Sequence, residues 1–245
     1  MRRIMLALVL GLVAGTAQAQ QVDPFGTQPE DAHRSPAPVG SDSEPPLIGG
    51  VDARLEAMDS VVYRLASTSR LQVRTGKSGL LGFAGHTHVI QARGFHGEVV
   101  YYPRNPLSSR LDITVVTDSL EVLTPPDTAE IRKVTETMRT SVLRTVEYPE
   151  IKLVSRKVTP TPDGFRILAA MTMAGRTQEL PIDIVARIGV DTLEAASTFS
   201  VKQTDFGITP VSAGPGGAIK VADRVTFDIR AVAVRVPSAA LSAKE

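Results

Sequence analysis

Two histidines, His86 and His88, have the residue type and spacing that most clearly suit a chemical role. In an extended strand alternate side chains share a face, so both rings would point the same way, with Cα atoms about 6.5 to 7 Å apart. Two imidazoles at this distance could bind one metal ion or a haem. The alternative, which we favour, is that the pair forms hydrogen bonds to neighbouring groups or to the headgroup of a ligand.

A third metal ligand would have to be His96, because the chain has no cysteine and His33 lies far away in the sequence. The register of the intervening chain decides whether His96 can join the pair. A hairpin loop of Arg93 and Gly94 places it on the wrong side, and a loop that also includes Ala92 places it on the right one. If the strand merely bends at Gly94, His96 is too far along. Zinc sites take three protein ligands in a catalytic role and four in a structural one, so we predict no metal site.

Lys202 and Asp205 are the other candidate chemical groups, since burial can tune such residues to act as base and acid in a hydrolase or isomerase. They follow Phe199 and Val201, which alternate with polar residues as in a strand. Asp205 also precedes Phe-Gly, which is typical of a turn in which the carboxylate binds nearby backbone. No serine nucleophile elbow or dinucleotide fingerprint occurs, and the glycines of 214–217 lack the lysine and hydroxyl of a phosphate loop. We therefore predict no catalytic residues.

Short alternating segments predict a mainly antiparallel β domain that holds these groups. They lie at 70–74, 80–92, 94–102, 111–116, 151–155, 165–173, 182–188, 193–201 and 221–236. About eight short strands separated by turns favour a sandwich or a barrel over a parallel sheet. One segment, 127–145, instead places Ile131, Val134, Met138 and Val142 at intervals of three and four, which predicts an amphipathic helix with Asp127 as its N-cap.

The N-terminus predicts export. Residues 1–19 match a secretory signal peptide, with two arginines, an apolar run over 4–13 and a small-residue cleavage site that ends at Ala19. The apolar run is too short to span a bilayer core of about 30 Å, and no later segment reaches that length. We expect a periplasmic or secreted protein with no integral membrane segment. Its net charge after cleavage, −1, and the lack of a basic cluster do not favour a nucleic-acid partner.

Composition divides the remaining chain into three parts. Residues 20–60 are rich in proline, glycine and serine, and we predict a disordered tether there. The β domain follows at 61–237, and residues 238–245 form a C-terminal tail. Aromatic residues are only 4% of the chain and tryptophan is absent, so aliphatic side chains must fill the core.

Several motifs, in order, resemble one known family. They are Gly85-His86-Thr87-His88-Val89, Tyr148-Pro149-Glu150-Ile151 with Ser155 after it, the segment Met171–Gly175, Lys202-Gln203-Thr204-Asp205-Phe206-Gly207-Ile208, and Val221-Ala222-Asp223-Arg224-Val225. Together they cover about residues 62–236 and resemble the lipid- and polyisoprenoid-binding proteins with the YceI-like fold.

The resemblance implies a lipocalin-like antiparallel β-barrel with one amphipathic helix and an elongated apolar cavity. Its implied ligand is an isoprenoid lipid such as a polyprenyl quinone, and no other cofactor is expected. Small inward-facing side chains leave room for a ligand in an eight-stranded barrel. The candidate ligand-binding residues are Phe83, His86, His88, Phe95, Leu153, Ala169, Met171, Ile184, Phe199, Val201 and Phe227. A monomer and a homodimer are both compatible with the sequence.

Overall fold

The computed structural model describes residues 53–78, 87–124, 128–213, 216 and 219–237. All of these residues belong to one compact unit of the chain. The predicted signal peptide, most of the predicted tether and the predicted C-terminal tail therefore lie outside the described residues. Phe83, His86 and Asp127 lie outside them as well.

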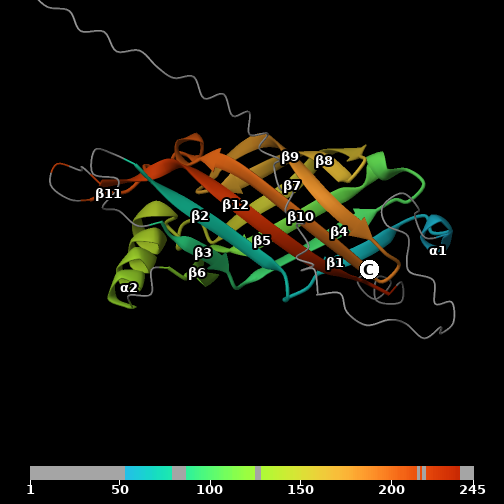
Figure 1. Cartoon of the computed structure of the whole chain (residues 1–245), viewed down its shortest axis with the longest axis horizontal. Coiled ribbons are helices and arrows are strands. Elements are labelled where there is room, and N and C mark those ends of the chain that lie inside the picture. Colours follow the sequence, from blue (N-terminus) through green and yellow to red (C-terminus); the bar gives the residue numbers. More distant parts are fainter. Residues whose placement is uncertain (1–52, 79–86, 125–127, 214–215, 217–218, 238–245) are drawn as a thin grey trace, which may run out of the picture. The chain divides into compact units, whose positions relative to one another are not determined.

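The described residues form a mainly antiparallel β-barrel, which confirms the predicted fold class (Figure 1). The strands are β1 (Val61–Leu65), β2 (Arg70–Ser78), β3 (Val89–Ala92), β4 (Phe95–Tyr101), β5 (Arg110–Val116), β6 (Leu120–Val122), β7 (Glu150–Thr161), β8 (Gly164–Met173), β9 (Arg176–Ile188), β10 (Thr192–Lys202), β11 (Ser212–Ala213) and β12 (Ile219–Arg235). The helical segments are α1 (Ala53–Glu56), η2 (Pro106–Ser108), η3 (Thr117–Ser119), α2 (Thr128–Thr137), η4 (Met138–Val142) and η5 (Gln203–Phe206).

Strand pairing closes the barrel. The hydrogen-bonded order is β1-β4-β5-β7-β8-β9-β10-β12, and β1 pairs with β12 to complete the ring. Strands β2, β3 and β6 extend the same sheet from β12. Because β1 and β2 both run antiparallel to β12, with Leu65 opposite Ala233 and Arg70 opposite Arg230, they are two parts of one long strand.

The same continuity joins β3 to β4 and β5 to β6. Ile90 lies opposite Val122 and Phe95 lies opposite Val115, so the pairing direction is kept across both breaks. With each pair counted as one strand, the described residues form the closed 8-stranded barrel that the sequence predicts.

Serine hydroxyls bridge two of these breaks. The Ser69 hydroxyl donates to the carbonyl of Val232 and accepts from its N–H, both at 3.0 Å. The Ser119 hydroxyl accepts from the N–H of Gly94 at 2.7 Å. Backbone groups that lose a strand partner at a break thus keep a hydrogen bond.

The end of the barrel near the β1–β12 seam is closed by its own apolar cluster. Tyr63 is fully buried there with Tyr101 and Leu193, and its hydroxyl donates to the carbonyl of Gly189 at 2.6 Å. Burial raises the pKa of Tyr63 to about 12. Leu55 of α1 packs in the same cluster, so the folded part includes residues that the sequence analysis assigned to the tether.

Helix α2 and the π-helical turn η4 lie at the opposite end, in the segment where the sequence predicts an amphipathic helix (Figure 1). Met138 is buried, and Ile131, Val134 and Val142 pack against the main core cluster. The helix follows β6 and precedes β7, two strands with no pairing to each other in the described part of the chain. Among the described residues, none of the helices is long and apolar enough to cross a membrane.

Candidate ligand-binding site

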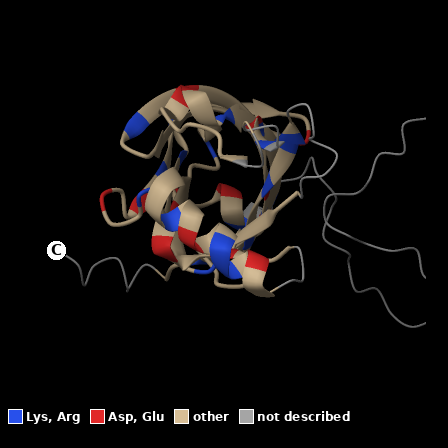
Figure 2. Cartoon of the chain, turned by 90° about the vertical axis from the view of Figure 1, so that its left-hand side faces the viewer, with Lys and Arg blue, Asp and Glu red and all other residues tan. Residues whose placement is uncertain are grey.

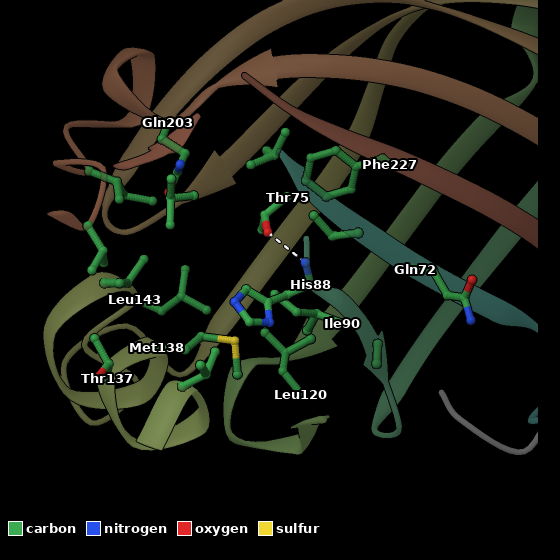
Figure 3. A pocket seen from close by; sticks show the side chains of 18 of the residues that line it. Gln72, Thr75, His88, Ile90, Leu120, Thr137, Met138, Leu143, Gln203 and Phe227 are labelled. Atoms are coloured by element: carbon green, nitrogen blue, oxygen red, sulfur yellow. Dashed lines mark hydrogen bonds between the residues drawn. The ribbon is translucent and has the colours of Figure 1, made fainter. Parts of the chain in front are cut away.

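A cavity of about 770 Å³ lies between the barrel and α2 (Figure 3). Strands β2, β3 and β12 supply one set of its walls, and α2 with η4 supplies another. Most lining side chains are apolar; they include Val73, Ile90, Leu120, Val134, Met138 and Phe227. Such walls suit the hydrocarbon part of a ligand.

A few polar side chains interrupt this apolar lining. His88 Nδ1 lies 2.8 Å from the carbonyl oxygen of Thr124. Because a carbonyl only accepts, Nδ1 carries the proton, and Nε2 of the neutral ring is a hydrogen-bond acceptor. The hydroxyl of Thr75 accepts from the His88 N–H at 3.1 Å, and Gln203 Nε2 donates to the carbonyl of Ala222 at 2.9 Å. These bonds fix polar groups that could meet a ligand headgroup.

Charged residues of both signs also line this cavity. Lys77, Lys133 and Lys220 are exposed and lie on three different elements, and Glu130 of α2 accompanies them. Figure 2, which looks at the α2 end, shows cationic and anionic residues intermixed on the helix. This end of the cavity is therefore the polar one.

A second cavity, of about 120 Å³, lies further inside the barrel. Its lining is almost wholly apolar and includes Leu153, Ile184, Ala195 and Ala231. Its walls come from the strands of the closed ring, whereas the large cavity is lined mainly by β2, β3, β12 and α2.

The two aromatic rings of Phe199 and Phe227 lie where the cavities adjoin. The residues are opposite each other on β10 and β12, and the rings stack with centroids 4.9 Å apart and planes 3° apart. Phe227 lines the large cavity and Phe199 lines the small one. Ile229 lines both.

The structure separates the histidines in its described part. Strand β3 pairs with β2 and β6, and β4 pairs with β5 and β1, so Ala92–Gly94 is no hairpin loop and the chain continues past Gly94. His88 lines the large cavity, whereas His96 is exposed and alternates with the inward residues of β4. His86 lies outside the described residues. Within the described residues, no three histidine or acidic side chains are grouped to hold a metal.

Lys202 and Asp205 lie at the end of β10 and in η5, and both are exposed. Gly207 ends this turn with φ of 72°, as expected for a glycine in a left-handed conformation. The carboxylate that binds the turn is that of Asp223 on β12, which accepts from the N–H and hydroxyl of Thr204 at 2.9 and 2.8 Å. These hydrogen bonds lower the pKa of the Asp223 carboxyl, and the bond from the Thr204 N–H has the largest effect. The predicted turn is present, but the carboxylate that bonds Thr204 is that of Asp223 and not that of Asp205.

The predicted ligand-binding residues fall into four groups. His88 and Phe227 line the large cavity, and Leu153, Ile184 and Phe199 line the small one. Of the other described candidates, Phe95, Ala169, Met171 and Val201 pack in the core and line neither cavity. Phe83 and His86 lie outside the described residues.

Many lining residues were not predicted, and one segment supplies several of them. Val134, Met138, Val142 and Leu143 of the α2–η4 segment form a wall of the large cavity. The spacing of Val134, Met138 and Val142 predicts an amphipathic helix, but it did not predict a cavity beside that helix. The spacing shows which face is apolar and not whether that face meets side chains or space.

Comparison with known protein families shows which family the chain is related to. The YceI-like domain family matches residues 66–233, well over half of the chain. The chain belongs to this family. The YceI-like match spans both the closed ring and the strands that wall the large cavity, and it confirms the resemblance inferred from the motifs. Among curated proteins, none matches the sequence.

Solved structures show a similar fold at low sequence identity. BcnA of Burkholderia cenocepacia has a TM-score of 0.53 and 13% identity over 67% of this chain and 95% of that chain. A polyisoprenoid-binding domain of Saccharophagus degradans has a TM-score of 0.49 and 12% identity over 71% and 98%. The YceI protein of Campylobacter jejuni has a TM-score of 0.47 and 13% identity over 60% and 85%. At such identities the similarity to BcnA supports the fold alone.

Proposed function

We propose that this protein binds one amphipathic lipid, of isoprenoid or quinone type, and carries out no catalysis. The observation that carries the proposal is the mostly apolar cavity of about 770 Å³. Ligand cavities are typically about 300 to 1,000 Å³, with a few polar groups that orient the ligand. Lys202 and Asp205, the residues that could have supported a hydrolase, are exposed and line neither cavity.

Burial of the tail supplies free energy that can offset the cost of association. Each buried methylene contributes about 0.8 kcal/mol. Ten such groups contribute about 8 kcal/mol, which is comparable with the cost of about 4 to 15 kcal/mol for association. Affinity can therefore come from the tail, while the headgroup sets orientation.

The headgroup belongs at the α2 end in this proposal. His88 offers an acceptor nitrogen there, and exposed lysines from β2, α2 and β12 surround the cavity. The choice of an isoprenoid tail rests on membership of the YceI-like family and on the motifs that resemble its lipid-binding members.

Organic extraction of natively purified protein, followed by mass spectrometry, tests this function. We expect one class of lipid in near-stoichiometric amount. Ile90→Trp fills the cavity and should remove most of the bound lipid. Gln91→Trp adds the same ring at the next position of β3, where the side chain bonds Gln72 and lines neither cavity, and it should retain the lipid. An empty extract from the wild-type protein, or equal lipid in the two variants, contradicts the proposal.

We also propose that the protein acts after export to the periplasm or the medium. Residues 1–19 support this on sequence alone. Intact-mass measurement of the protein from its native host should give a mature chain that begins at Gln20. A mature chain that retains Arg2 and Arg3 would contradict export through this signal.

A further inference from the structure

We propose that the stacked pair Phe199 and Phe227 limits the length of the lipid tail that this protein accepts. The inference rests on the proposed function and concerns the inner end of the same site. Phe227 forms part of the large cavity's wall, at a distance from α2 (Figure 3). Its ring lies flat on that of Phe199, which faces the small cavity.

The packing around the two rings makes the pair a barrier between the large and the small cavity. Phe227 is 8% exposed, and Met171 and Val201, from the same core cluster, are 2% and 7% exposed. Neither Met171 nor Val201 lines a cavity. Phe227 is therefore close-packed with its core neighbours, and Ile229, which lines both cavities, shows how near the cavities approach each other.

The small cavity has the chemistry of a tail site but not the size. Its lining is almost wholly apolar, yet its volume is about 120 Å³, well below the range of about 300 Å³ and more that holds a ligand on its own. It becomes useful to a tail only as a continuation of the large cavity. Removing the two rings would join the cavities and lengthen the site along the barrel.

The test is a titration of delipidated protein with straight-chain primary alcohols from decanol to eicosanol. For the wild-type protein we expect affinity to rise about fourfold with each added methylene while the tail finds apolar walls. The affinity should then level off at the length that reaches the rings. In Phe199→Ala/Phe227→Ala the rise should continue for several further methylenes.

Two further variants isolate the partition from general loosening of the core. Phe95→Ala removes the same side chain from a residue that packs against the core cluster and lines neither cavity. Its break point, the tail length at which affinity levels off, should therefore match that of the wild type. Ala195→Leu, added to the double variant, refills the small cavity and should bring the break point back. If the double variant does not fold, Phe199→Leu decides the question, because its smaller side chain should still move the break to longer tails.

The outcomes distinguish the two proposals. Failure of the wild-type protein to bind any alcohol contradicts the proposed function, and the inference falls with it. If the wild-type protein binds the alcohols but all variants share its break point, the proposed function stands and the partition by Phe199 and Phe227 is contradicted. An equal shift in Phe95→Ala also overturns it, because the effect would then come from loss of packing.

Discussion

Ser69 takes the place of a strand partner at the point where β1 gives way to β2. Its buried hydroxyl satisfies both backbone groups of Val232, on the strand that both segments share. Without it, the Val232 N–H would lose its partner, whereas the Val232 carbonyl would still accept from the Ala66 N–H at 2.8 Å. A hydroxyl in this position lets the barrel change direction without leaving backbone groups unpaired.

Ser69→Ala should lower the free energy of unfolding by about 1 to 3 kcal/mol, because it leaves the part-buried N–H of Val232 without its hydrogen-bond partner. Urea denaturation followed by circular dichroism measures the change. Ser108→Ala is the matched control, since the Ser108 hydroxyl bonds the exposed Asn105 side chain. An exposed change of this kind should stay within about 0.5 kcal/mol. Equal effects of the two substitutions would contradict the role given to Ser69.

At the same scale, the sequence predicted the turn after β10 better than the contacts within it. Gly207 and the polar cluster before it indicated a tight turn, and the structure contains one. The carboxylate that bonds Thr204 comes from Asp223, which lies on the neighbouring strand. Local pattern can identify a turn, but it cannot identify a partner that only strand pairing brings near.

Among the elements, the β8–β9 hairpin depends directly on two loop residues. Its loop consists of Ala174 and Gly175, both with positive φ, at 48° and 76°. Two positive values suit a two-residue hairpin loop of the type that follows strand twist. A Cβ at Gly175 would also lie 2.5 Å from Tyr148 Cε1.

Gly175→Ala should therefore destabilise the protein by about 1 to 3 kcal/mol, since it combines a strained left-handed residue with a steric clash. A thermal melt with a matching urea titration would detect the loss. Gly189→Ala provides the comparison, because a Cβ there meets its nearest neighbour at an ordinary 3.5 Å and its φ is unstrained. A Gly175 variant as stable as the Gly189 variant would show that the hairpin tolerates the side chain.

The sequence predicted the strands and the helix because each has its own period. Alternation identified which strand residues face inward, and the spacing of Ile131, Val134 and Met138 identified the helix face. The helix predicted over 127–145 covers η4, but its π-helical form was not predicted, and neither was the short helix α1. Helix α1 is too short to show a period, and its Leu55 gains its role only from distant partners such as Tyr101.

For the whole molecule, ligand binding and stability should be coupled. A ligand that binds the native state and not the unfolded one adds RT ln(1 + [L]/Kd), about 2.7 kcal/mol at a hundred times Kd. Delipidated protein should accordingly melt at a lower temperature than natively purified protein, and returning the extracted lipid should restore the difference. Identical melts before and after a verified extraction would indicate that the cavity does not hold the lipid.

Barrel closure and the cavity were the parts of the molecule least accessible to pattern. Alternation shows that a residue faces inward, but it does not say which strand lies beside it. Closure was predicted from the family resemblance, and the pairing of Tyr63 with Arg235 bears it out. Inward residues such as Met171 and Val73 have similar sequence patterns, yet one is packed in the core and the other lines the large cavity.

The seam between β1 and β12 also governs the order in which the protein can fold. It joins the first strand of the ring to the last, so the ring cannot close until nearly the whole domain has been synthesised. Contacts between such distant parts of a chain make folding slow, on the scale of milliseconds to seconds for β-barrels. Until β12 arrives, the edge of β1 and the inward apolar faces stay open to other chains. The last strand to be made therefore ends the period in which this protein is most prone to aggregate.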